Sequence, residues 1–165
     1  MDRTDFLNSL QRFTIGIVED CRFPVRCQRD DDGTPVPRAP DVYKMRLPDS
    51  KSATKKAPYI LHQIVTGKDQ QKPGDKRTAS TVTVRTIFCV YCDDEQEGGM
   101  LLLELMERVR IALLRQHAIE SRYAPDREAG VETLIYPEDT APYYVGEMVS
   151  VWRLPAVEME VPNWP

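Results

Sequence analysis

The cysteines and histidines are the residues of this chain with the greatest capacity for metal binding or nucleophilic chemistry. Cysteines stand at Cys21, Cys27, Cys89 and Cys92, and the Cys89-x-x-Cys92 spacing resembles half of a zinc site or a redox motif. Such pairs usually lie in a turn or at a helix start, whereas this pair ends a β-rich segment. Side chains three apart on a regular strand point to opposite faces. We interpret the cysteines as buried structural residues, with a composite four-thiolate metal site as the alternative.

The two histidines, His62 and His117, are not accompanied by a recognisable catalytic pattern. His62 falls within a predicted strand. His117 falls near the end of a predicted helix, where a cation suits the helix dipole. The sequence contains no G-x-S-x-G nucleophile elbow. Both histidines are therefore interpreted as structural, and the sequence predicts no enzyme and no catalytic residue.

Acidic and glycine-rich segments also lack the patterns of known ligand sites. Asp30–Gly33 faintly resembles a calcium loop, but aligning Gly33 with the loop glycine places Gln28 at the first ligand and Ala39 at the bidentate glutamate. The segment is interpreted as a charged turn. Gly98–Gly99 lacks the Lys-Ser/Thr that completes a phosphate-binding loop. No cofactor is predicted.

Two clusters of basic residues lie in segments predicted to be loops. The ordinary interpretation of such clusters is a solvated loop. The alternative is that they line a pore or meet an acidic neighbour, which requires little beyond positive charge and reach. The candidate interface or lumen residues are Lys51, Lys55 and Lys56 in the first cluster, and Lys68, Lys72, Lys76 and Arg77 in the second.

Length and composition favour one soluble globular domain spanning residues 1–165. The chain is 41% hydrophobic and 29% charged, with a net charge of −4. This charge argues against a dedicated nucleic-acid binder, although a local basic patch remains compatible with it. The start of the chain has no apolar signal-peptide core, and no stretch has the length of a membrane span. Clustered cysteines in a chain of this size favour a reducing compartment, so we expect assembly in cytoplasm and no membrane partner.

Hydrophobic periodicity predicts two helices, at residues 2–21 and 98–117. In the first, Phe6, Leu10, Phe13 and Ile17 form one stripe, and Asp2 or Thr4 can cap its start. In the second, the core-facing stripe consists of Leu102, Leu105, Met106, Val109 and Leu113. Glu104 and Arg108 are predicted to form an i,i+4 ion pair on its outer face.

Strand patterns predict a mostly antiparallel sheet of four to five strands. Residues 59–66 are apolar on both faces, and residues 81–92 alternate strongly. These two segments are predicted to pair as a hairpin joined by a long polar turn region, 67–80. Further strands are predicted at 131–136, 144–153 and 157–161. The fold class is therefore α+β, with the two main helices packed on one face of the sheet.

The stretch 28–57 is predicted to be an extended arm or loop within this domain. It contains four prolines and three consecutive aspartates, with a short strand-like segment around Val42, Tyr43, Met45 and Leu47. A segment this poor in apolar residues cannot offset its own ordering entropy. Long loops of this kind are usually functional or disordered, and in an assembly subunit such an arm often orders against a neighbour.

Several segments in one order resemble the tail terminator and related neck proteins of long-tailed bacteriophages and prophages. They are Pro58–Ile60 continuing to Ile64–Val65, the strand Val82–Ile87, the break at Glu97–Gly99, the helix Leu102–Arg110 and the late strands through Trp152. The resemblance covers about residues 58–161 and lies in layout and local character. The arm at 28–57 has no counterpart in it.

This resemblance implies a structural virion protein of the neck or tail, assembled in the bacterial host cytoplasm. Such proteins form a homo-oligomeric ring, usually a hexamer, that docks on the last ring of tail tube protein and stops its polymerisation. The ring also meets the head–tail connector proteins, and its lumen can contact passing DNA. One alternative is a head-side connector or stopper ring. The other is a cysteine-based metal-binding module.

Overall fold

The computed structural model describes residues 2–26, 36–48, 56–137 and 139–162 of the chain, and it contains two helices and six strands. The helices and strands follow one another along the chain as α1 (Arg3–Val18), β1 (Asp41–Lys44), β2 (Tyr59–Gln71), β3 (Arg77–Tyr91), α2 (Gly98–Arg115), β4 (Ala124–Pro125), β5 (Val131–Ile135) and β6 (Tyr143–Glu158).

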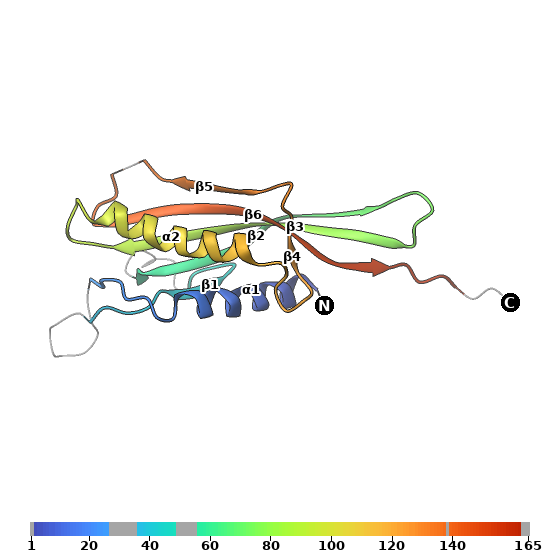
Figure 1. Cartoon of the computed structure of the whole chain (residues 1–165), viewed down its shortest axis with the longest axis horizontal. Coiled ribbons are helices and arrows are strands. Elements are labelled where there is room, and N and C mark those ends of the chain that lie inside the picture. The colour runs from blue at the N-terminus through green and yellow to red at the C-terminus, as the bar shows by residue number, and fades with distance from the viewer. Residues whose placement is uncertain (1, 27–35, 49–55, 138, 163–165) are drawn as a thin grey trace.

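The strands form one mixed sheet in the order β1-β2-β3-β6, with β4 and β5 both pairing along the far side of β6. Only β1 and β2 run parallel; the other pairs are antiparallel. Both helices lie against the same face of the sheet, α1 below and α2 in front in Figure 1. The predicted α+β class, with an antiparallel-rich sheet and two helices on one face, is confirmed.

The helix starts and faces agree with the sequence patterns. Asp2 caps α1 in a reciprocal capping box with Asp5, each carboxylate accepting a hydrogen bond from the other residue's backbone N–H. All five residues of the predicted α2 stripe are buried. The predicted Glu104–Arg108 pair was wrong. Arg108 instead donates two 2.8 Å hydrogen bonds to Asp20 just beyond α1, because a partner on the neighbouring helix end outcompetes a weak exposed i,i+4 contact.

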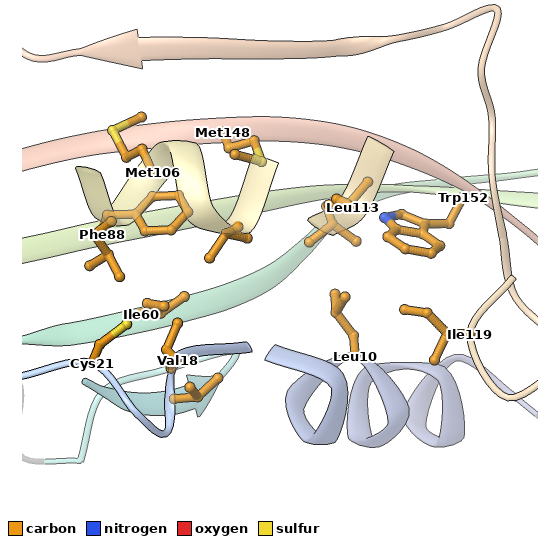
Figure 2. Close-up of a cluster of buried hydrophobic side chains, with 14 of the residues drawn as sticks. Leu10, Val18, Cys21, Ile60, Phe88, Met106, Leu113, Ile119, Met148 and Trp152 are labelled. Carbon is orange, nitrogen blue, oxygen red and sulfur yellow. The ribbon is translucent and has the colours of Figure 1, made fainter. Parts of the chain in front are cut away.

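The main hydrophobic core fills the space between the two helices and the sheet. Figure 2 shows its side chains converging from five elements: Leu10 and Val18 from α1, Ile60 from β2, Phe88 from β3, Met106 and Leu113 from α2, and Met148 and Trp152 from β6. At one end, the Phe6 ring lies 5.3 Å from both the Tyr123 and the Trp152 rings, measured between centroids. This burial is what holds α1 and α2 on the sheet.

A second, smaller cluster covers part of the opposite face of the sheet. It consists of Leu47, Ala57, Tyr59, Leu61, Cys89 and Tyr143. Leu47 lies within the predicted arm, and so does β1, which pairs in parallel with the first residues of β2. The strand-like segment predicted around Val42, Tyr43, Met45 and Leu47 corresponds to β1. Outside β1 the described residues 36–48 are loop apart from one bridge at Arg38, but Val42 and Leu47 are buried and hold this stretch on the sheet. The rest of 28–57 is largely outside the described residues.

Two further sequence predictions differ from the observed strands. Residues 67–80 were predicted as a polar turn region, but β2 runs to Gln71 and β3 begins at Arg77. The predicted strands 144–153 and 157–161 are one strand, β6, up to Glu158. Pro155 does not end it, because the chain bulges there: Ser80 pairs with Leu154 and Thr78 with Val157. A bulge is a position where proline is tolerated within a sheet.

Candidate assembly surfaces

The outer halves of β2 and β3 form a ribbon that projects beyond the helices, defined here as residues 65–81 (Figure 1). Residues 65–71 of β2 are all exposed, and the ladder continues through Lys68–Thr81 to Gln71–Thr78. Seven strand residues span about 23 Å. Two-stranded hairpins without an apolar face are marginally stable in water. The ribbon therefore depends on its base and on β6 beside it.

Local sequence explains why the ribbon forms despite its polar composition. The tip is a tight turn in which the Asp75 N–H donates to the Lys72 carbonyl at 3.0 Å and Gly74 adopts φ +81°, a conformation that glycine adopts without steric cost. The Asp75 carboxylate accepts a 2.9 Å bond from the Arg77 N–H. On β3, Thr78 and Thr81 are β-branched residues suited to strands. Turn chemistry and strand propensity thus replace hydrophobic burial.

The base of the ribbon is tied to the start of α1 through Asp69. Arg3 donates to the Asp69 carboxylate at 2.9 Å, and the Ser80 hydroxyl donates to its other oxygen at 2.6 Å. The Arg3 guanidinium lies so close to Gly67 that a side chain there would collide with it at 2.6 Å. The Met159 N–H beyond β6 donates to the Lys76 carbonyl at 2.8 Å. These contacts join the ribbon to the helix and to the C-terminal strand.

The four residues of the second basic cluster all lie on this ribbon. Lys68 is on β2, Lys72 and Lys76 flank the turn, and Arg77 begins β3. None of these four side chains has a hydrogen-bond or ion-pair partner within the described part of the chain. Within the described residues, their charges are therefore not neutralised by a side-chain partner.

The first basic cluster is not brought to the ribbon where the structure describes it. Lys56 precedes the buried start of β2, and its carbonyl accepts a 2.7 Å hydrogen bond from Arg38. The 13 residues of β2 separate it from the ribbon tip, a length of about 43 Å. Lys51 and Lys55 lie outside the described residues. The two basic clusters were predicted as a pair of loops, but the length of β2 separates Lys56 from the second cluster.

The opposite edge of the sheet, formed by β5, is the second exposed surface. Among the described residues β5 pairs with β6 alone, so within that part of the chain the other side of Val131–Ile135 presents unpaired backbone groups. Glu132 is exposed, and Leu134 and Ile135 are exposed to 51% and 44%. Sequence analysis predicted the strand but not this edge, because edge position depends on long-range pairing that a single segment does not encode.

Next to β5, the carboxylate of Glu147 is neutralised by an ion pair with Arg85. The Arg85 guanidinium donates to Glu147 at 2.5 Å and to the Tyr136 hydroxyl at 2.8 Å, and Tyr136 donates to the same carboxylate at 3.0 Å. The carboxylate beside it raises the pKa of Arg85 further above its ordinary value. Glu132, by contrast, has no such partner among the described residues, and it leaves this edge acidic.

His62 is sealed inside the main core rather than placed at a surface. The Thr14 hydroxyl donates to the Leu10 carbonyl at 2.8 Å, so it must accept from the His62 Nε2–H, also at 2.8 Å. The His62 Nδ1 then accepts from the Thr86 hydroxyl at 2.8 Å. Burial lowers the pKa of His62 from 6.5 to about 3, so the ring is neutral. Thr14, His62 and Thr86 are all buried and satisfy one another's hydrogen bonds inside the core.

The three described cysteines are free and buried, as the sequence predicted. Cys21 belongs to the helix-side core, whereas Cys89 belongs to the cluster on the other face. Burial raises the pKa of the Cys89 thiol to about 12, which keeps it protonated and unreactive. Cys27 and the Asp30–Gly33 segment lie outside the described residues. Within residues 2–26, 36–48, 56–137 and 139–162, no group of three or more His, Cys, Asp or Glu side chains could hold a metal ion.

No protein-family model and no curated protein sequence matches this chain. In the part of the chain that the structure describes, no helix is both long and apolar enough to cross a membrane.

Proposed function

We propose that this protein is a non-enzymatic virion assembly subunit: a tail terminator that forms a ring at the end of a bacteriophage tail tube and joins the tube to the head connector. The ring is a homo-oligomer, with six copies as the expected number. The resemblance of residues 58–161 to the neck proteins of long-tailed phages supports this proposal.

The ribbon of residues 65–81 is the observation that carries it. This polar extension, which β6 flanks along β3, contributes no residue to either hydrophobic cluster, and it costs conformational entropy to order. Its basic side chains are unpaired within the described residues. Such a feature is well suited to contacts with another protein, where its edge can be paired and its charges matched.

The candidate reactive groups support an assembly role more than an enzymatic one. The His62 imidazole and its two threonine partners are 3% exposed or less, so a substrate cannot reach them. The Cys89 thiol is fully buried. The accessible features are instead two strand edges of opposite charge.

The test is to polymerise tail tube protein from the same phage or prophage with and without this protein. We expect short, capped tubes in its presence, with a ring visible at one end by electron microscopy. The test variant has a shortened ribbon, in which an Asn-Gly turn joins Lys68 to Thr81. It retains the whole core, and we expect it to leave tube length unlimited.

A protein that stays strictly monomeric and leaves tube length unchanged would overturn the proposal. Binding to the isolated head connector, without any effect on the tube, would identify a head-side stopper ring instead. Zinc retained by the purified protein and lost on Cys89→Ser and Cys92→Ser substitution would favour the metal-binding alternative.

A further inference from the structure

We infer that the ribbon of one subunit docks along the open β5 edge of a second copy, so that subunits join head to tail. This inference rests on the proposed ring and specifies the two surfaces that build it. The segment that occupies the β5 edge is the outer part of β2, residues 65–71, of an identical chain.

The two surfaces are free backbone edges on opposite sides of the same sheet. β1 pairs with β2 at Tyr59–His62, and no described strand pairs with the outer edge of β2 along residues 65–71. No described strand pairs with β5 on the side away from β6 either. In Figure 1 the ribbon and β5 both run along the long axis of the molecule, with the ribbon projecting past the core. A neighbour shifted along this axis can therefore add its β5 to the β2 edge and continue the sheet.

Charge makes these two edges complementary. Residues 67–77 contain four basic side chains and two acidic ones in a protein whose net charge is −4. Both acids are already engaged within the ribbon or its base, Asp69 by Arg3 and Asp75 by the Arg77 N–H. Residues 126–137, which precede and form β5, contain three acidic side chains and a single arginine. A basic ribbon on an acidic edge steers two copies together and fixes their orientation.

The same charges disfavour the symmetric arrangements. A two-fold pairing of ribbons would bring two basic segments together, and a two-fold pairing of β5 edges would bring two acidic segments together. Like charges across paired strands are destabilising. The remaining arrangement joins two different surfaces, and a contact of that kind closes into a ring when its rotation allows.

Exposed apolar residues on both edges add to this match. Val65 on the ribbon is 50% exposed and Leu134 on β5 is 51% exposed. Each lies beside an edge whose backbone groups are unpaired. Pairing the two edges would shield these side chains from water while satisfying the backbone hydrogen bonds.

Charge reversal on each surface tests the inference directly. The first variant is Lys68→Glu/Lys72→Glu/Lys76→Glu on the ribbon, and the second is Glu128→Lys/Glu132→Lys at β5. In either variant alone, every subunit contact would join like charges. In an equal mixture, the acidic ribbon of the first variant meets the basic edge of the second, and the unchanged ribbon of the second meets the unchanged edge of the first.

We expect each variant alone to lose self-association by about a hundredfold or more, and the mixture to recover it in native mass spectrometry. Circular dichroism checks that each variant is folded. The matched control is Asp93→Lys/Glu95→Lys, which changes the charge as the β5 variant does but lies in the loop before α2. This control should assemble like the natural protein.

Each other result counts against the inference. Assembly of either single variant at natural concentrations would show that the ribbon and β5 do not meet, and so would failure of the mixture to assemble. Rings that form regardless of these charges and still cap tubes would overturn this inference alone. Rings that need the two surfaces but ignore tail tube protein would overturn the proposed tail role alone. A natural protein that never self-associates would overturn both.

Discussion

The two ends of the β2–β3 pair have the same hydrogen-bonding pattern but different surroundings. Near Tyr59 and Cys89, one face packs under the helices and the other under the smaller cluster, so Ile60 and Phe88 are fully buried. Near Gln71 and Thr78, neither hydrophobic cluster of the described residues reaches the strands, so Gln71 is exposed and Thr78 is only half-buried. The covered half supplies the stability of the subunit. The bare half contributes no residue to either hydrophobic cluster.

Truncating the buried half should produce the largest effect. We expect Phe88→Ala to lower the free energy of unfolding by about 3–5 kcal/mol, because it removes a fully buried ring and leaves a cavity. The matched substitution in the bare half is Thr78→Ala, expected to cost less than about 1 kcal/mol. Urea denaturation of both variants measures the contrast. Equal losses would mean that the ribbon belongs to the same cooperative core.

The same contrast explains which helices and strands could be predicted from the sequence. Helices α1 and α2 were predictable because each has an apolar stripe of period 3.6, and Asp2 supplies a capping side chain. Residues 67–80 were predicted as a polar turn region because they have no apolar face, so they carry no alternation that would indicate strands. The ladder that forms the ribbon, from Lys68–Thr81 to Gln71–Thr78, is a property of backbone pairing.

The candidate site was predictable only in its residue types. Lys68, Lys72, Lys76 and Arg77 could be read as an interaction cluster from charge alone, and they do lie together. Their acidic counterpart at Glu132 was missed because an edge strand and an inner strand differ in their neighbours, which lie far away in the sequence. The contact between Arg3 and Asp69 joins residues 66 apart and has no local signal.

Acid should weaken the buried half through His62. Below pH 6.5 the unfolded chain gains a proton at this residue, while the folded ring stays neutral until its lowered pKa of about 3. The stability that the neutral His62 contributes is therefore fully present above pH 6.5. As the pH drops through this window, the free energy of unfolding falls by about 1.4 kcal/mol per pH unit. At pH 5 the expected loss is about 2 kcal/mol relative to pH 7.

Chemical denaturation of His62→Gln at both pH values isolates this effect. The variant loses the titrating ring, so the difference between its stabilities at pH 7 and pH 5 should be smaller by about 2 kcal/mol, whatever its absolute stability. An unchanged slope in His62→Gln would contradict the sealed, neutral imidazole.

The smallest effect should come from the contact that joins the two halves. Arg3 and Asp69 are 45% and 53% exposed in their side chains, so Arg3→Ala should lower global stability by only about 0.2–1 kcal/mol. Arg12→Ala is the matched control, because Arg12 lies on the same helix as Arg3 and forms a similarly exposed ion pair, at 2.7 Å, with Glu120 beyond α2.

The two variants should differ in where they loosen the fold. Amide hydrogen exchange across residues 67–71 should accelerate in Arg3→Ala and remain unchanged in Arg12→Ala, because only Arg3 holds the base of the ribbon against α1. Equal exchange in both would mean that backbone pairing with β3 and β6 alone positions the ribbon, and the bare half would then be rigid without help from the helix.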